Sequence, residues 1–163
     1  MFKKCTGGLL AAALVAMFST AAHAQYFTQK VISLAEAKKM AAAASAEAVK
    51  NNWKIVIAVV DNEGGLIYFE RADGAQAGSL DVAIGKARTA ALFRRSTKAM
   101  EDIVNGSKDA PGRITALKLF PLPAQGGLPV KAGDEFVGAM GCSGGTSAQD
   151  EQVCAAGIAA GTK

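Results

Sequence analysis

The side chains best suited to chemistry in this sequence lie between positions 71 and 89. Lys86 and Thr89 are three residues apart, so on a helix they share one face, whereas Arg88 points elsewhere. A lysine and a threonine above small residues can hold a carboxylate, and an arginine holds one better through its planar fork. The pattern predicts an anion pocket built from Arg71, Asp73, Lys86, Arg88 and Thr89. The alternative is that Arg71 and Asp73 pair locally and that Lys86 is solvated, as most surface charges are.

Two glycine-rich segments can add backbone donors to this pocket. Gly126, Gly127 and Pro129 lie in 121–129, which has three prolines and two glycines, and we expect no regular element there. Backbone N–H groups in such turns bind anions, so the glycine pair can form one wall of the pocket, or a backbone surface that something approaches closely. Ser143 opens a Ser-Gly-Gly turn before a predicted helix and resembles a small anion nest. Either segment can equally be a turn without a ligand.

The first 24 residues have the three parts of a signal peptide. Lys3 and Lys4 precede an apolar run over 9–18, and Ala22-His23-Ala24 supplies the small-x-small cleavage triplet. A membrane anchor is the weaker interpretation, because a bilayer needs roughly 20 apolar residues. We therefore predict a signal peptide over 1–24 and a periplasmic or secreted single domain over 25–163, with no membrane segment after cleavage.

Cleavage changes both the charge and the chemistry of the chain. The sequence has 18 basic and 14 acidic residues. Loss of Lys3 and Lys4 leaves a net charge near +2, which together with the lack of a basic run argues against a nucleic-acid partner. His23 is the only histidine and is lost too. Histidine acid–base catalysis and histidine-bound metal or haem are thereby excluded.

No catalytic set is evident in the remaining chain, so an enzyme is the less favoured interpretation. A carboxylate base such as Asp61 or Asp150 remains an alternative, although Asp150 is better placed to neutralise a helix N-terminus. Cys5 leaves with the signal peptide, and Cys142 and Cys154 remain. An oxidising compartment favours a disulfide between them, and two buried free thiols are the alternative.

The pattern of apolar residues and turn formers predicts an α+β fold. We expect helices over 33–50, 79–96, 97–105 and 147–160, and strands over 54–60, 66–71 and 135–142. Ser33, Ser79 and Ser147 are the expected helix caps. The segment 106–112 is polar and irregular, and 114–120 is ambiguous. Antiparallel strands with segregated helices define the α+β class.

Several motifs, in this order and spacing, resemble the GlcG/HbpS haem-binding family over residues 30–163. They are Val59-Val60-Asp61-x-x-Gly64, Phe69-x-Arg71-x-Asp73-Gly74-Ala75, Ser79, Ile84-x-Lys86-Ala87-x-Thr89-Ala90, Gln125-Gly126-Gly127-x-Pro129 and Val137-Gly138-x-x-Gly141-x-Ser143-Gly144. The resemblance implies a profilin-like or PAS-like antiparallel sheet with helices packed on it, and assembly into homo-oligomers. It also implies haem as a cofactor, or a link to small hydroxy acids such as glycolate.

The resemblance implies a histidine on the haem iron, and the mature chain has none. The expected function is thus binding of haem or a related planar anionic ligand without histidine. Its propionates would be held by Lys86, Arg71 or Arg88. Iron would then need Tyr26, Tyr68, a methionine, a cysteine or a lysine. Met140 and Tyr68 are better explained as residues of the sheet. The alternative function is an enzyme or accessory protein acting on a small hydroxy or keto acid.

Overall fold

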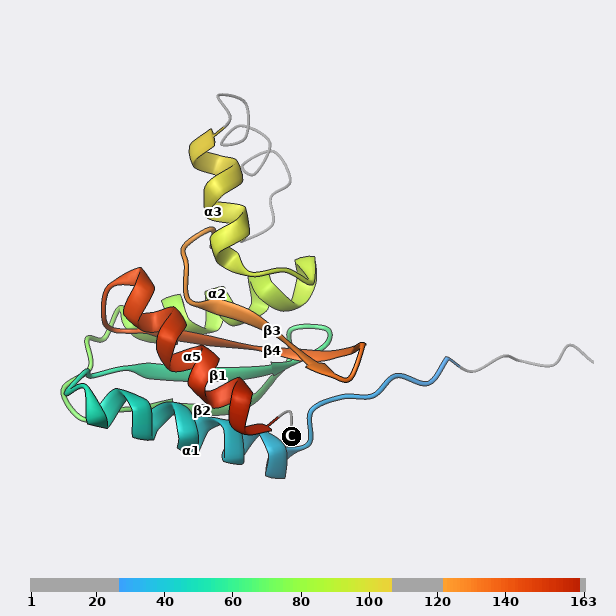
Figure 1. The fold of residues 1–163 in the computed structure, drawn as a ribbon, viewed down its shortest axis with the longest axis horizontal. Helices are drawn as coiled ribbons and strands as arrows, with labels where there is room; N and C mark the ends of the chain where they lie inside the picture. Colours follow the sequence, from blue (N-terminus) through green and yellow to red (C-terminus); the bar gives the residue numbers. More distant parts are fainter. Residues whose placement is uncertain (1–26, 107–121, 162–163) are drawn as a thin grey trace, which may run out of the picture.

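The computed structural model describes residues 27–106 and 122–161 (Figure 1). The order is helix, hairpin, two helices, hairpin, helix. The elements are α1 (Leu34–Lys50), β1 (Val56–Asp61), β2 (Leu66–Arg71), α2 (Ser79–Phe93), α3 (Thr97–Gly106), β3 (Gly127–Ala132), β4 (Glu135–Ser143) and α5 (Ser147–Gly161). The predicted signal peptide and the ambiguous segment 114–120 lie outside the described residues.

All pairings in the sheet are antiparallel, and its strand order is β2-β1-β4-β3. β1 is one of the two inner strands. Every residue from Val56 to Val60 is buried, as expected for a nearly continuous β-branched run. Side chains of a strand alternate between the faces of a sheet, so β1 contributes to two separate cores. The α+β class predicted from the sequence is confirmed.

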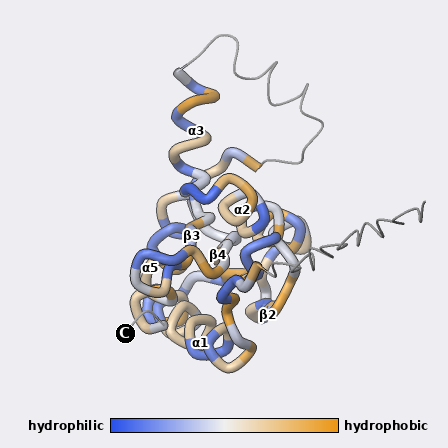
Figure 2. Tube along the Cα trace, turned by 90° about the vertical axis from the view of Figure 1, so that its right-hand side faces the viewer, coloured by the Kyte–Doolittle hydropathy of each residue, from blue (hydrophilic) through white to orange (hydrophobic). Residues whose placement is uncertain are grey.

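Helices cover both faces of the sheet. One core lies under α1 and α5 and contains Ile57, Val59 and Met140, while the other lies under α2 and contains Ala58 and Val60. Figure 2 shows α1 and α5 on one side of the strands and α2 on the other, with α3 projecting from the body. A residue that joins α2 to α5 must therefore pass from one layer to the other.

The α2 layer packs exceptionally close to the sheet, and glycines permit this. A Cβ at Gly141 in β4 would lie 2.2 Å from the carbonyl oxygen of Ala83 and 2.5 Å from the amide nitrogen of Ala87. No side chain fits at such distances, so the α2 backbone rests directly on the backbone of β4. Ala83 and Ala87 are fully buried and small enough to allow this approach.

The structure corrects several predicted boundaries. α2 ends at Phe93 rather than at residue 96, because Arg94 takes a left-handed conformation with φ 50° and ψ 37°. The first strand starts at Val56 rather than at 54. The expectation of no regular element over 121–129 is wrong from Gly127 onwards, where β3 begins. Pro129 is tolerated there because β3 is an edge strand, which leaves one row of N–H positions unpaired.

Of the three predicted helix caps, only Ser33 is confirmed. Its hydroxyl accepts a hydrogen bond from the Glu36 amide at 3.1 Å. Ser79 is already the first residue of α2. The residue before it, Gly78, follows consecutive turns, has a helical conformation and offers no side-chain cap. Ser147 is likewise the first residue of α5. Thr146 caps that helix by accepting from the Gln149 amide, while the Gln149 side chain accepts from the Thr146 amide.

Candidate functional site

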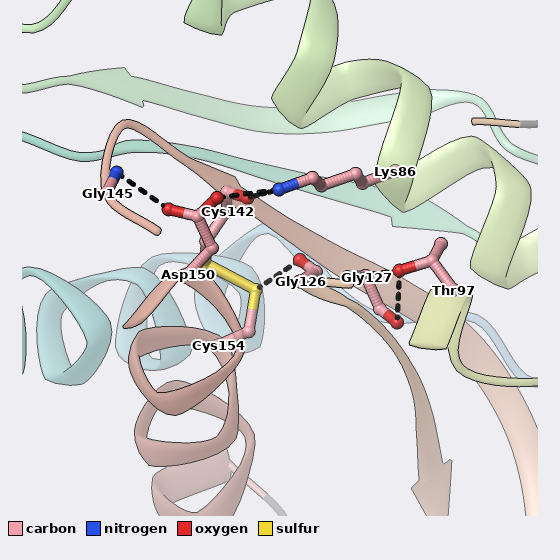
Figure 3. Close-up of a disulfide and its surroundings, with 8 residues drawn as sticks. All are labelled: Lys86, Thr97, Gly126, Gly127, Cys142, Gly145, Asp150 and Cys154. Carbon is pink, nitrogen blue, oxygen red and sulfur yellow. Dashed lines mark hydrogen bonds and ion pairs between the residues drawn. A yellow bond between two sulfur atoms is a disulfide. The ribbon is translucent and has the colours of Figure 1, made fainter. Parts of the chain in front are cut away.

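Lys86, the centre of the predicted anion pocket, forms a buried ion pair. Its side chain is 3% exposed and its Nζ donates to Asp150 Oδ2 at 2.6 Å and to the carbonyl oxygen of Cys142 at 3.1 Å. Figure 3 shows it reaching from α2 towards α5 beside the end of β4. The alternative in which Lys86 is solvated is wrong. The pair joins the helical layers on the two faces of the sheet.

Asp150 holds the other half of this pair and also binds the turn before its helix. Its Oδ1 accepts from the Gly145 amide at 2.9 Å. Burial raises the pKa of Asp150, while the hydrogen bond from Lys86, the backbone donors of Gly145 and Gly144 and the charge of Lys86 act in the opposite direction. The predicted anion nest at residues 143–145 thus receives an anion, and that anion is the chain's own carboxylate.

Gly126 and Gly127, where β3 begins, lie directly against this ion pair. Gly126 has φ +117°, and a Cβ there would lie 2.7 Å from Asp150 Cβ and 2.9 Å from Lys86 Nζ. At Gly127 a Cβ would lie 2.5 Å from the carbonyl oxygen of Lys86. The Gly127 amide donates to Thr97 Oγ1 at 2.8 Å. The predicted close approach at this glycine pair is therefore confirmed, and the groups that approach belong to the protein itself.

A disulfide lies directly beside the ion pair (Figure 3). Cys142 and Cys154 are both fully buried, with Cα atoms 5.8 Å apart, and their bridge joins β4 to α5. The predicted pairing is confirmed. Cys142 thus ties the two helical layers together twice, through its carbonyl oxygen to Lys86 and through its sulfur to α5.

The other predicted site residues do not converge on one point. Thr89 is buried on the same face of α2 as Lys86, and its hydroxyl accepts from the Leu122 amide at 2.7 Å. Arg71 is exposed and donates to the carbonyl oxygen of Ala75 at 2.6 Å. Among the described residues no ion pair joins it to Asp73, so the alternative of a local pair between them is not observed.

Arg88 lies at the β1–β2 turn, where its Nε donates to the Gly64 carbonyl at 3.2 Å. Pro129 pairs with Ala139 on the edge strand and Ser143 is buried at the end of β4. The sequence interpretation identified a real cluster around Lys86 but missed two of its members. Thr97 gave no signal, and Asp150 was considered as a carboxylate base and as a charge at the N-terminus of its own helix, not as the partner of Lys86.

A groove lies elsewhere, between the segment before α1, the end of α5 and the β3–β4 hairpin. Its volume is ≈ 520 Å³, within the range of about 300–1,000 Å³ of small-molecule sites. Apolar wall residues include Val31, Ile32, Val130 and Val137, and Lys30 and Lys131 supply the basic groups. None of these residues belongs to the cluster predicted from the sequence.

Comparison with known proteins places these features in a family. The model of the family described as "Haem degrading protein HbpS-like" matches residues 32–159. The chain belongs to this HbpS-like family. It is 41% identical over 116 residues to protein GlcG of Escherichia coli, covering 71% of this chain and 84% of that one. It is 38% identical over 119 residues to an uncharacterized 15.0 kDa protein of Citrobacter freundii, covering 73% and 84%.

Several solved structures share the fold. Klebsiella pneumoniae protein ORFY has a TM-score of 0.80 at 29% identity, covering 85% of this chain and 96% of that one. HbpS has a TM-score of 0.74 at 29% identity, covering 83% and 93%. PduOC, solved as a haem complex, has a TM-score of 0.74 at 26% identity, covering 80% and 94%.

The described side chains of this HbpS-like chain suit the propionates of a haem better than its iron. The described residues contain no histidine. Met140 is fully buried in the sheet, and the Tyr68 hydroxyl donates to Glu70 at 3.1 Å, while Tyr26 lies outside the described residues. Within residues 27–106 and 122–161 no three His, Cys, Asp or Glu side chains are grouped to hold a metal ion. No helix in those ranges has the length and hydropathy to cross a bilayer.

Proposed function

We propose that this protein binds haem or a related planar anionic molecule, and that it does so without a histidine on the iron. The observation that carries the proposal is the structural similarity to PduOC, which was solved with haem and which matches 80% of this chain. The match to the HbpS-like family over residues 32–159 points in the same direction.

The expected affinity follows from the available contacts. Charge-assisted hydrogen bonds to the two propionates contribute roughly 1.5–3 kcal/mol each before desolvation is counted. Burial of one apolar face of the ring adds about 25 cal/mol per Å². Together these reach about −8 kcal/mol, which corresponds to a dissociation constant near 1 μM. Nanomolar affinity would need a strong iron ligand, which the described residues do not offer.

The test is a titration of the protein with hemin, followed by absorbance. The full chain is expressed with its own N-terminal segment and purified after processing. We expect saturable micromolar binding with a spectrum unlike that of a bis-histidine site. Following the Soret band over hours in the presence of a reductant separates binding from haem breakdown, the reaction named in the family description. Absence of binding at 100-fold higher hemin concentration would reject the proposal. Thermal protection by glycolate would then favour the small-acid alternative.

Export and self-assembly are further parts of the proposal. The first rests on the signal-peptide pattern of residues 1–24, and N-terminal sequencing of the exported protein should give Gln25. The second rests on the family resemblance, and light scattering at micromolar concentration should give a mass of at least two chains. A start at Met1 in the exported fraction, or a mass of one 139-residue chain, would contradict the respective part.

A further inference from the structure

We propose that the groove between the segment before α1, the end of α5 and the β3–β4 hairpin binds the ligand, and that it recognises the carboxylates and apolar face of a porphyrin rather than its metal. This inference rests on the proposed function and adds the site and the basis of recognition.

The groove has the volume and the apolar walls that a small apolar molecule needs. Its volume is ≈ 520 Å³, and it is partly open to solvent. Val31 is 55% exposed, while Ile32, Val130 and Val137 are buried behind it. An exposed valine backed by a packed apolar floor offers surface that a ligand can remove from water without displacing the core.

Charge complementarity favours a ligand that carries carboxylates. Lys131 lies on the exposed end of β3, and no ion pair among the described residues engages it. Lys30 faces the same groove and pairs with Glu135 at 2.8 Å, with its own side chain 70% exposed. Exposed pairs of this kind are weak, so Lys30 can turn to a ligand carboxylate at small cost. Two lysines against the single carboxylate of Glu36 leave the groove lining with a positive balance, which suits the two propionates of a porphyrin.

The alternative location, around Lys86, is closed to an external anion. Its ammonium group is buried and already bound to Asp150 and to the Cys142 carbonyl. The Gly127 amide is likewise bound to Thr97. A ligand carboxylate would have to displace Asp150 from a 2.6 Å contact in the interior, which leaves a buried carboxylate unpaired.

Lys30 and Lys131 are assigned to the carboxylates, and no histidine, tyrosine or cysteine lines the groove to hold the metal. Met40 is the one sulfur-bearing residue among those that line it, and its side chain is fully buried between α1 and the end of α5. Iron at the centre of a ring in the open groove would not reach that sulfur without rearrangement of the core. Metal-free protoporphyrin IX should therefore bind about as tightly as hemin.

The experiment measures the affinity of the full chain for hemin and for protoporphyrin IX in two groove variants and two matched controls. Lys131→Glu reverses the free charge, and Val31→Asp places a carboxylate on the apolar wall. The controls are Lys54→Glu and Val49→Asp, which make the same replacements at exposed positions outside the groove. Val49 is 74% exposed and lies about 20 Å along α1 from Glu36, the first residue of that helix in the groove.

We expect about tenfold weaker binding of both probes in each groove variant, and affinities within about twofold of the unaltered protein in the controls. The two probes should bind the unaltered protein within about threefold of each other. Far-UV circular dichroism checks that all four variants are folded.

The outcomes separate this inference from the proposed function. If the unaltered protein binds neither probe, the proposed function is refuted. If it binds hemin and both groove variants bind equally well, the function stands and the groove is refuted. If hemin binds far more tightly than protoporphyrin IX, recognition depends on the metal and the second half of the inference is overturned.

Discussion

Replacing Lys86 with methionine would test whether the buried ion pair holds the two helical layers together. Methionine keeps most of the apolar length of lysine and removes the charge. The side chains of Lys86 and Asp150 are 3% and 4% exposed, so solvent cannot compensate the carboxylate that remains. Removal of one partner from a buried pair costs about 3–5 kcal/mol of unfolding free energy.

The cost should depend on pH in a defined direction. Burial raises the pKa of Asp150 above its ordinary value of 3.8, and the contacts with Lys86 oppose that rise. Without Lys86 the folded-state pKa of Asp150 rises further above the unfolded value. Between the unfolded and the folded pKa, Asp150 of the folded variant holds a proton that the unfolded chain has released. The stability that this proton contributes is fully present below about pH 4. That stability is lost as pH rises through the raised pKa, at up to about 1.4 kcal/mol per pH unit.

Urea unfolding at pH 5 and pH 8 measures both effects. We expect Lys86→Met to be destabilising at both values and more so, by about 1 kcal/mol, at pH 8. Adding Asp150→Asn should remove the difference between the two pH values, because an amide does not titrate. Lys98→Met is the matched control, since Lys98 pairs with Asp102 on the surface of α3 and an exposed pair contributes about 0.3–0.5 kcal/mol. A cost below that of the control, or one equal at pH 5 and pH 8, would refute this account.

Two further predictions concern the same junction. Reduction of the Cys142–Cys154 disulfide, which spans 12 residues, should lower the unfolding free energy by about 2–4 kcal/mol, and urea midpoints with and without dithiothreitol measure this. Two free thiols per chain in the unfolded, unreduced protein would contradict it. Gly141→Ala places a Cβ 2.2 Å from the Ala83 carbonyl and should cost about 3 kcal/mol, whereas Gly78→Ala, with nothing within 4 Å, should cost less than about 0.5 kcal/mol. Equal midpoints for the two alanine variants would show that α2 can move away from β4.

Local patterns in the sequence were sufficient to predict every described element except β3, which begins inside the segment where no regular element was expected. The β-branched run around Val56 to Val60 predicts a buried strand, and the Ser33–Glu36 spacing predicts the start of α1. The boundaries that were missed depend on backbone conformation. Arg94 ends α2 in a left-handed conformation that residue type does not favour, and Pro129 enters a strand only because that strand lies at an edge.

The site was predictable only in part, because its decisive contact is long-range. Helical spacing correctly places Lys86 and Thr89 on one face of α2. The partner, Asp150, is 64 residues further along the chain and on the opposite side of the sheet, and no local pattern connects the two. The close approach at Gly126 was foreseen from the glycine pair, but the sequence did not show that the approaching group would be a lysine of the same protein.

Lys86 and Lys131 illustrate how the two kinds of site in this protein differ. The polar groups around Lys86 are hydrogen-bonded to one another. The Lys86 ammonium binds Asp150 and the Cys142 carbonyl, and the Gly127 amide binds Thr97. A change there acts first on the free energy of unfolding, because it leaves a buried group without its partner. Lys131 contributes little to folding, because it is exposed and no ion pair among the described residues holds it. Binding free energy can be altered at Lys131 while stability stays constant. Variants of this chain should therefore fall into two separable classes: loss of stability with an altered pH dependence around Lys86, and loss of affinity at unchanged stability along the groove.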